Sequence, residues 1–309
     1  MNFLQRERSE HAMLSLCMSR SVSIVGAGRL GRALGRSLRR LGWRIGAVVT
    51  RSAAHSRAAV RAIGAGRPLA TLTSKVMDAD VILLMTPDDV LTEVARQLAR
   101  VAGKKCRGKT VLHGSGALDR SVLQALARCG AATGSIHPMQ TFTNNSQPNL
   151  KGVIFAIEGQ PRARRAAGAI ARSLGGIPVP VASSSKPAYH AAGTLVAGHA
   201  LALTEAAAQT LIRLGFTRMQ AMQTLLPLMR QMLHNFEKHG PRAAWTGPAS
   251  RGDYATLKKH QQALRRQPRE FSESYAALLR LSARVLAKNP AATLKKLDRA
   301  FKNSRRNSK

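Results

Sequence analysis

A glycine pattern between two regular stretches is the feature that most constrains this fold. Residues 21–26 (SVSIVG) are short, apolar and β-branched, which predicts a buried parallel strand. Residues 29–41 follow with the apolar spacing of a helix. The turn between them has the pattern G-x-G-x-x-G, formed by Gly26, Ala27, Gly28, Arg29, Leu30 and Gly31. In this strand–turn–helix context the pattern predicts a dinucleotide-binding turn, although a glycine-rich turn without a ligand stays open.

Each glycine has an expected task in such a turn. Gly26 would allow the sharp turn, and Gly28 would let the backbone approach a pyrophosphate. Gly31 would let the helix pack close to the strand, and the helix N-terminus would stabilise the anion.

Strand-like and helical stretches alternate through residues 20–182, which predicts an α/β doubly wound, mostly parallel sheet. Further strands are expected at 43–50, 79–85, 109–113, 132–137, 152–158 and 176–181, and further helices at 53–64, 88–102, 117–128 and 161–174. Beyond residue 183 only helical patterns occur, at 187–214, 217–238, 253–265 and 269–288. We therefore expect a leader (1–19), a Rossmann domain (20–182), an all-α domain (183–295) and a solvated basic tail (296–309).

The end of the second strand favours NADP(H) over NAD(H). An NAD site usually has an acid here for the ribose 2′-hydroxyl, but the chain reads Val-Thr-Arg-Ser. Arg51 could pair with a 2′-phosphate, and Thr50 and Ser52 could donate hydrogen bonds to it. Arg51 could also be one of many basic residues placed there by chance.

Three loops lie beyond predicted strand ends, where doubly wound sheets bind ligands. Thr86 and Pro87 would border the cofactor, Ser115 follows the strand that ends at His113, and His137 ends another strand. A histidine at a strand end can donate a proton or hold substrate, or it can make a structural hydrogen bond.

Two segments of the helical domain carry further candidates. Lys186 precedes Pro187 at a predicted helix start, and His190 lies one turn later. Lys186 could polarise or protonate a carbonyl, or it could be a surface lysine. Arg251 could meet an anionic substrate, whereas Asp253 also fits a helix cap.

Charge and cysteine content restrict the partners and the compartment. The chain has 49 Lys and Arg against 15 Asp and Glu, a formal net charge of +34. The basic residues are spread along the chain, so we expect at most non-specific nucleic-acid binding.

Cys17, Cys106 and Cys129 lack metal or redox spacing, so we expect no metal site and a cytoplasmic location. Residues 187–214 are apolar nearly all round; His190, His199 and Glu205 favour a buried or subunit-interface helix over a membrane span.

Six stretches together resemble a known family. They are IVGAGRLGRALG, VILLMTPDD, VLHGSGAL, GSIHPMQTF, KPAYHAAGTLVAGHALAL and TGPASRGDYATLKKH. The chain resembles the Rossmann-like proteins with a helical C-terminal domain of unknown function, relatives of pyrroline-5-carboxylate reductase, ketopantoate reductase and the 6-phosphogluconate dehydrogenase superfamily. The resemblance implies a homodimer with an active cleft between its domains. Relatives tend to carry Asn near position 198, where this chain has Gly198 and His199.

The leading hypothesis is therefore an NADP(H)-dependent oxidoreductase that reduces a small carbonyl or imine compound, with a 2-oxo acid such as ketopantoate as the best single guess. Lys186 and His190 would be catalytic, and substrate would contact His137, Arg251, Asp253, His199 and Ser115. The alternative is a nucleotide-binding or sensing protein on a reductase scaffold, without turnover, which the missing Asn favours.

Overall fold

The computed structural model describes residues 20–144 and 148–302; the expected leader and the last seven residues lie outside this range. By its internal contacts the chain divides between Ala197 and Gly198 into two compact units. The sequence placed this division at residue 183, where strands give way to helices. The first helix after that point contacts the first unit, so the structural division falls later.

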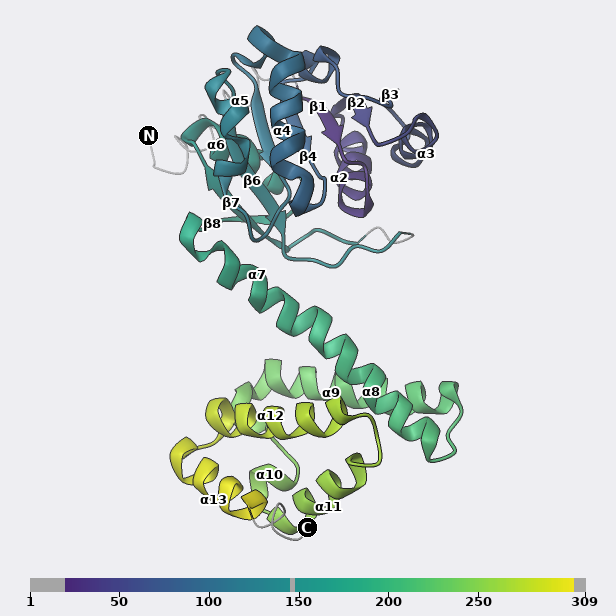
Figure 1. The fold of residues 1–309 in the computed structure, drawn as a ribbon, viewed down its shortest axis with the longest axis vertical. Helices are drawn as coiled ribbons and strands as arrows, with labels where there is room; N and C mark the ends of the chain where they lie inside the picture. Colours follow the sequence, from purple (N-terminus) through teal and green to yellow (C-terminus); the bar gives the residue numbers. More distant parts are fainter. Residues whose placement is uncertain (1–19, 145–147, 303–309) are drawn as a thin grey trace, which may run out of the picture. The chain divides into compact units, whose positions relative to one another are not determined.

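The first unit is built on one eight-stranded sheet (Figure 1). The strands lie in the order β3-β2-β1-β4-β5-β6-β7-β8. Their bounds are β1 (Ser21–Val25), β2 (Arg44–Val49), β3 (Arg67–Leu69), β4 (Val81–Leu84), β5 (Thr110–His113), β6 (Ala132–Pro138), β7 (Ile154–Gly159) and β8 (Ile177–Pro180). All neighbours are parallel except β6 and β7. The predicted doubly wound α/β fold is confirmed.

Helices cover both faces of the sheet (Figure 1). One face packs against α2 (Arg29–Arg40), α3 (Ala53–Ile63) and α6 (Pro161–Ser173), whose Leu, Ile and Ala side chains fill a core with β1 and β4. The other face packs against α4 (Asp88–Ala102) and α5 (Gln124–Arg128), with the short 3₁₀ turns η1 (Ser74–Asp78), η2 (Gly103–Cys106) and η3 (Arg120–Leu123). Two-sided burial explains why the central strands are continuous apolar runs.

Two local elements differ from the sequence prediction. The strand β3 was not expected, because three residues that include Pro68 give no periodic signal. The helix expected at 117–128 starts only at Arg120, as η3, and becomes α-helical at Gln124. The side chain of Asp119 accepts a hydrogen bond from Ser121 N and so caps this later start.

The rest of the described chain is helical, as expected. It comprises η4 (Ser183–Ser185), α7 (Lys186–Thr194), the π-helical turn η5 (Leu195–His199), α8 (Ala200–Arg213), α9 (Arg218–Ala244), α10 (Pro248–Arg251), α11 (Tyr254–Leu264), α12 (Arg269–Leu286) and α13 (Pro290–Lys302). A core of Leu257, Ala283 and Leu297 joins α11, α12 and α13.

One expectation for this helical part is wrong, and one alternative of a second is excluded. Residues 296–302 are not a solvated tail, because Leu294, Leu297 and Phe301 share one face of α13 and pack on the core beside α12. For residues 187–214 the alternative of burial within the chain is excluded, because Leu201 and Leu214 are each 71% exposed, whereas the subunit-interface alternative stays a prediction. By length and composition alone, Ser183–Arg213 would also suffice to cross a membrane, with a mean hydropathy of 1.3. An apolar helix left uncovered by its own chain needs another partner.

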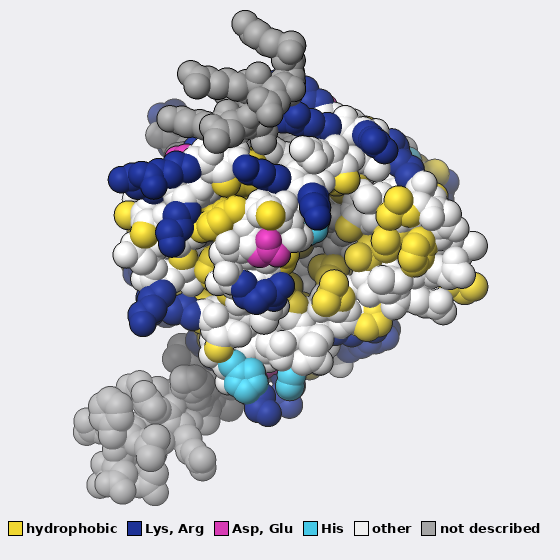
Figure 2. All heavy atoms as spheres, turned by 90° about the horizontal axis from the view of Figure 1, so that it is seen from below, with side chains coloured by type: hydrophobic (Ala, Val, Ile, Leu, Met, Phe, Trp, Pro, Cys, Tyr) yellow, Lys and Arg dark blue, Asp and Glu magenta, His cyan; other side chains and the backbone are white. Residues whose placement is uncertain are grey.

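The surface combines basic and apolar side chains. Figure 2 shows Lys and Arg side chains scattered over one face, with hydrophobic side chains exposed between them. The scatter agrees with the even spread of basic residues along the sequence.

Candidate functional site

The glycine turn forms a cradle at the carboxyl end of β1. Gly26 has φ +88°, and a Cβ there would lie 2.6 Å from the carbonyl carbon of Met85. A Cβ on Gly31 would lie 2.5 Å from Gly26 O, whereas a Cβ on Gly28 would meet nothing within 4 Å. Gly26 and Gly31 are thus required for packing, while Gly28 faces open space where a ligand can approach the backbone.

Unpaired donors point to an anion at this cradle. Helix α2 has no side-chain cap and no acidic residue in its first turn, so its first N–H groups have no partner within the helix. Thr86 follows β4 and sits against Gly26; its hydroxyl is buried and has no hydrogen-bond partner among the described residues. Helix N-termini with free N–H groups bind phosphates. The residues present therefore fit the pyrophosphate of a dinucleotide.

The end of β2 lies beside the cradle, since Gly26 N donates to Val49 O at 2.9 Å. Arg51 is exposed and makes no side-chain hydrogen bond or ion pair within the described part of the chain. The hydroxyls of Thr50 and Ser52 are already engaged, Thr50 with Ser56 (2.9 Å) and Ser52 as the cap of α3. Of the three side chains expected at a 2′-phosphate, Arg51 is the one left available.

Other expected cofactor residues take up less specific positions. Leu30 packs near Gly114, where a Cβ would lie 3.0 Å from its Cδ2, and Ala27 is buried. Arg29 is exposed and donates through Nε to Asn144 Oδ1 at 3.2 Å, from the connection after β6. Pro87 is exposed at the start of α4.

A histidine cluster lies at the ends of β5 and β6, next to the cradle along the sheet. Gly114 touches Met85 of the cradle, since a Cβ on Gly114 would lie 2.6 Å from Met85 Sδ. A Cβ on Gly116 would lie 2.6 Å from His190 Cδ2 and 2.8 Å from His137 Nε2. The two imidazoles meet edge to face, 5.6 Å between centroids. The structure thus brings together His137 and His190, two separate candidates from the sequence, over a glycine that leaves room for both.

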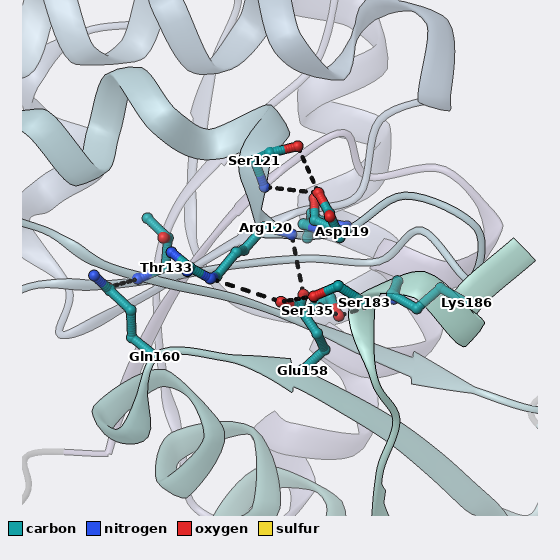
Figure 3. A network of polar contacts seen from close by, with 10 residues as sticks. Asp119, Arg120, Ser121, Thr133, Ser135, Glu158, Gln160, Ser183 and Lys186 are labelled. Carbon is teal, nitrogen blue, oxygen red and sulfur yellow. Dashed lines mark hydrogen bonds and ion pairs between the residues drawn. The ribbon is translucent and has the colours of Figure 1, made fainter.

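Lys186 is the first residue of α7, as the sequence predicted, but it is buried and not a surface lysine. Its side chain is 0% exposed. Its Nζ donates to Ser115 O (3.0 Å) and to Ser135 Oγ (2.9 Å), and Ser135 Oγ in turn donates to Glu158 Oε2 (3.5 Å; Figure 3). Glu158, 5% exposed, also accepts from Arg120 N (3.0 Å) and Ser183 Oγ (3.1 Å). The lysine therefore ties α7 to β5, β6 and β7 through a satisfied polar network.

Burial sets the protonation of this region. It lowers the pKa of His113 to about 3 and the pKa of His137 to about 4, with neighbouring cations acting in the same direction. His113 Nδ1 accepts from Ser115 N (3.2 Å), and Nε2 faces Asp119 O (3.1 Å), a contact that opposes the lowering of the His113 pKa by burial. Burial also lowers the pKa of Lys186, a shift opposed first by the charge of Glu158.

The remaining candidates have structural partners or lie in the second unit. The Ser115 hydroxyl donates to Asp88 Oδ2 (2.7 Å) and accepts from Leu118 N (2.9 Å), so it is occupied in the loop. His199 ends η5, and Arg251 is exposed at the end of α10. Asp253 caps α11, accepting from Thr256 N at 3.1 Å, and these hydrogen bonds lower its pKa.

The sequence prediction missed several residues of this site. They are Asp88, Gly116, Arg120, Ser135, Glu158 and Tyr189, whose hydroxyl lies 3.3 Å from His137 Nδ1. Glu158 could have been found, because it is the one charged residue in the apolar strand IFAIEG, and a buried carboxylate needs partners.

Comparison with known proteins agrees with this arrangement. Residues 9–138 match a Rossmann-like domain, and residues 153–281 match a domain of unknown function, DUF2520. The two matches follow one another along the chain, the Rossmann-like model first and DUF2520 second. This confirms the resemblance inferred from the sequence motifs.

Solved structures similar to this chain share its fold. One is a candidate NADP oxidoreductase from Bacteroides fragilis, with a TM-score of 0.71 and 22% identity, covering 84% of this chain and 96% of that one. Another is a protein from Thermotoga maritima (TM-score 0.63, 21% identity, 92% and 99% covered). A third is a reductive aminase from Aspergillus terreus in complex with NADPH and ethyl-5-oxohexanoate (TM-score 0.63, 16% identity, 89% and 98% covered).

Proposed function

We propose that this protein is an NADP(H)-dependent reductase of a small carbonyl or imine compound. The observation that carries the proposal is the adjacency of two sites on one sheet edge. A phosphate cradle with unpaired donors lies at β1 and β4, and a histidine pair lies at β5 and β6, joined through Gly114. A dinucleotide bound along the strand ends requires the two sites in this order. Its pyrophosphate would lie at the N-terminus of α2, and its nicotinamide would lie farther along the sheet edge.

The cofactor-binding residues would be the Gly26–Gly31 turn, Thr86 and Arg51. NADPH, when bound, supplies the hydride. The exposed Arg51 has no internal partner, and the described end of β2 carries no carboxylate to select NAD(H). The similar structures include an NADPH complex, which supports the same cofactor.

The residue that donates a proton to the substrate would be His190. Its ring is exposed at the first turn of α7 and packs against His137, which is neutral near pH 7 because burial lowers its pKa to about 4. We assign Lys186 a positioning role, because its ammonium is enclosed and donates to Ser115 O and Ser135 Oγ. It would hold the loop that carries Gly116 against both histidines.

The substrate class is tested by following NADPH absorbance with 2-oxo acids, including ketopantoate, and with cyclic imines. We expect turnover with at least one compound, and His190→Ala should lower kcat by about 10²-fold while NADPH binding is retained. Turnover that is unchanged in His190→Ala would remove the histidine from the chemistry.

A nucleotide-sensing protein without turnover is the second candidate. The observation that favours it is the internal use of Lys186 and of the Ser115 hydroxyl. The family resemblance adds an expected Asn near position 198, where this chain has Gly198. A sensor would bind NADPH and oxidise none of it across the whole panel, and the reductase would then be rejected.

The apolar helices of the second unit support a homodimer. Leu214, Met219 and Leu228 of the α8–α9 hairpin are 65–71% exposed, while the described core cluster of this unit has three fully buried members. So small a core rarely stabilises a helical unit alone. A second copy of the chain would cover this face with a matching apolar face.

A further inference from the structure

A cavity lies at the end of the sheet away from the phosphate cradle. It has a volume of about 320 Å³ and is lined at the amino ends of β2 and β3 and by η1. The cradle, in contrast, follows the carboxyl ends of β1 and β4. The two sites are therefore separated by the length of the strands, and this inference does not rest on the proposed function.

Three cations from three elements line this cavity. They are Arg44 at the start of β2, Arg67 at the start of β3 and Lys75 in η1. Their side chains are exposed and make no hydrogen bond or ion pair with any residue that the structure describes. Asp78, which also lines the cavity, is already paired with Lys105 at 3.3 Å. The cavity thus has an excess of positive charge.

The backbone around the cavity is shaped by a β-bulge. The register of β1 against β2 shifts between Val22 and Ile24, where β2 has one extra residue. The buried Ser23 Oγ accepts from Ala47 N at 3.1 Å and holds the bulge, and a Cβ on Gly46 would lie 2.8 Å from that oxygen. Pairing with β3 begins only at Ala47, so Arg44, Ile45 and Gly46 leave one backbone edge without a partner strand. Bulges of this kind commonly adjoin binding sites.

We propose that this cavity, formed by Arg44, Arg67 and Lys75, binds a small anion with two linked phosphate groups. The volume lies at the lower end of the range for small-molecule sites and exceeds the space of one phosphate. Three cations that line one cavity match an anion of more than one charge, and Arg forks pair with phosphate oxygens in bidentate geometry. The ligand would be free pyrophosphate or the diphosphate of a nucleotide.

Trp43, which precedes Arg44, provides a local reporter. The chain has two tryptophans, so Trp245→Phe leaves Trp43 as the single fluorophore. This full-length protein is titrated with inorganic pyrophosphate at constant ionic strength. We expect Arg67→Gln and Lys75→Gln each to weaken binding about tenfold, because each removes a charged hydrogen-bond donor. Arg165→Gln is the matched control, an exposed arginine on α6, which packs against the β5–β8 half of the sheet.

The other outcomes are equally distinct. Equal affinity in all variants, or equal weakening in the control, would overturn the site and indicate a response to net charge. If Gly28→Ala abolishes the fluorescence response to pyrophosphate, the ligand binds at the phosphate cradle, and the proposed site is overturned. Titration with ADP shows where the diphosphate comes from. An affinity for ADP comparable to that for pyrophosphate indicates a nucleotide ligand, and a weaker affinity for ADP indicates free pyrophosphate. Tighter binding of an RNA oligomer, with the same dependence on Arg67, would overturn the assignment to a small ligand.

Discussion

Lys186 shows how one residue can serve a site without touching substrate. An ammonium group removed from water is destabilising unless hydrogen bonds and an opposite charge compensate. Ser115 O, Ser135 Oγ and the nearby carboxylate of Glu158 supply that compensation. The lysine therefore fixes the start of α7, and with it His190, relative to the ends of β5 and β6.

Replacing Lys186 by Met should destabilise the fold by about 2–4 kcal/mol, because the Glu158 carboxylate loses its buried cation. The urea unfolding midpoint of the variant measures this, and turnover should fall with it. Lys151→Met, at an exposed position, is the control and should unfold like the parent chain. A Lys186→Met protein of unchanged stability but without turnover would make the lysine a catalytic residue instead.

His113 and His137 should make the fold sensitive to acid. The unfolded chain takes up their protons near pH 6.5, whereas the folded chain does so only near pH 3 and pH 4. Their contribution is complete above pH 6.5 and is lost as pH falls through this window, by about 1.4 kcal/mol per pH unit and histidine. Melting temperatures between pH 7 and pH 4.5 should fall less steeply in His137→Gln. A parallel fall in both proteins would contradict the shifted pKa of His137.

At this scale the sequence predicted part of the site. His137 and His190 were expected from their positions at a strand end and a helix start, and they do meet. The burial of Lys186 could not be predicted, because it depends on Ser135 and Glu158 from strands distant in the sequence. The use of the Ser115 hydroxyl could not be predicted either, because its acceptor Asp88 lies 27 residues earlier in the chain, at the start of α4.

In the strand–turn–helix element of β1 and α2, some glycines are needed for packing and another is available for ligand binding. A methyl group added to Gly26 or to Gly31 would lie within 3 Å of backbone atoms, whereas one added to Gly28 would meet nothing within 4 Å. Only the middle glycine can therefore be changed without disturbing the fold.

Gly28→Ala should weaken NADPH binding at least tenfold, because the new methyl group would occupy the approach to the pyrophosphate. Its melting temperature should stay within about 2 °C of the parent, since Gly28 has a negative φ of −73° in an extended backbone and an added Cβ would meet nothing within 4 Å. Calorimetry and thermal unfolding measure the two effects. Unchanged NADPH affinity in a stable variant would place the dinucleotide elsewhere.

The longer elements were predictable because each carries its own period. Buried strands such as β4 are apolar runs, and the helices of the second unit repeat apolar residues at helical spacing. Elements that depend on tertiary contacts were missed, including β3, η3 and the π-helical turn at Leu195–His199. The length of α13 was missed because its basic residues obscured the apolar spacing of Leu294, Leu297 and Phe301.

At the scale of the whole molecule, the exposed apolar side chains predict self-association. In Leu214→Glu the new carboxylate would lie at a position that is 71% exposed in one chain. If a second copy covers it, burying this charge should raise the dimer dissociation constant at least tenfold. Sedimentation velocity measures this, with Val90→Glu as the control at an exposed apolar position of α4. A monomeric parent protein, or one that associates only with lipid vesicles, would contradict the homodimer.

The central claim is that the cradle binds NADP(H), and a calorimetric titration with NADPH and, separately, NADH tests it most directly. We predict that NADPH binds about 10- to 100-fold more tightly, since a charged hydrogen bond to the 2′-phosphate contributes about 1.5–3 kcal/mol. In Arg51→Ala the two affinities should converge. Binding of neither dinucleotide by the parent protein would contradict the account.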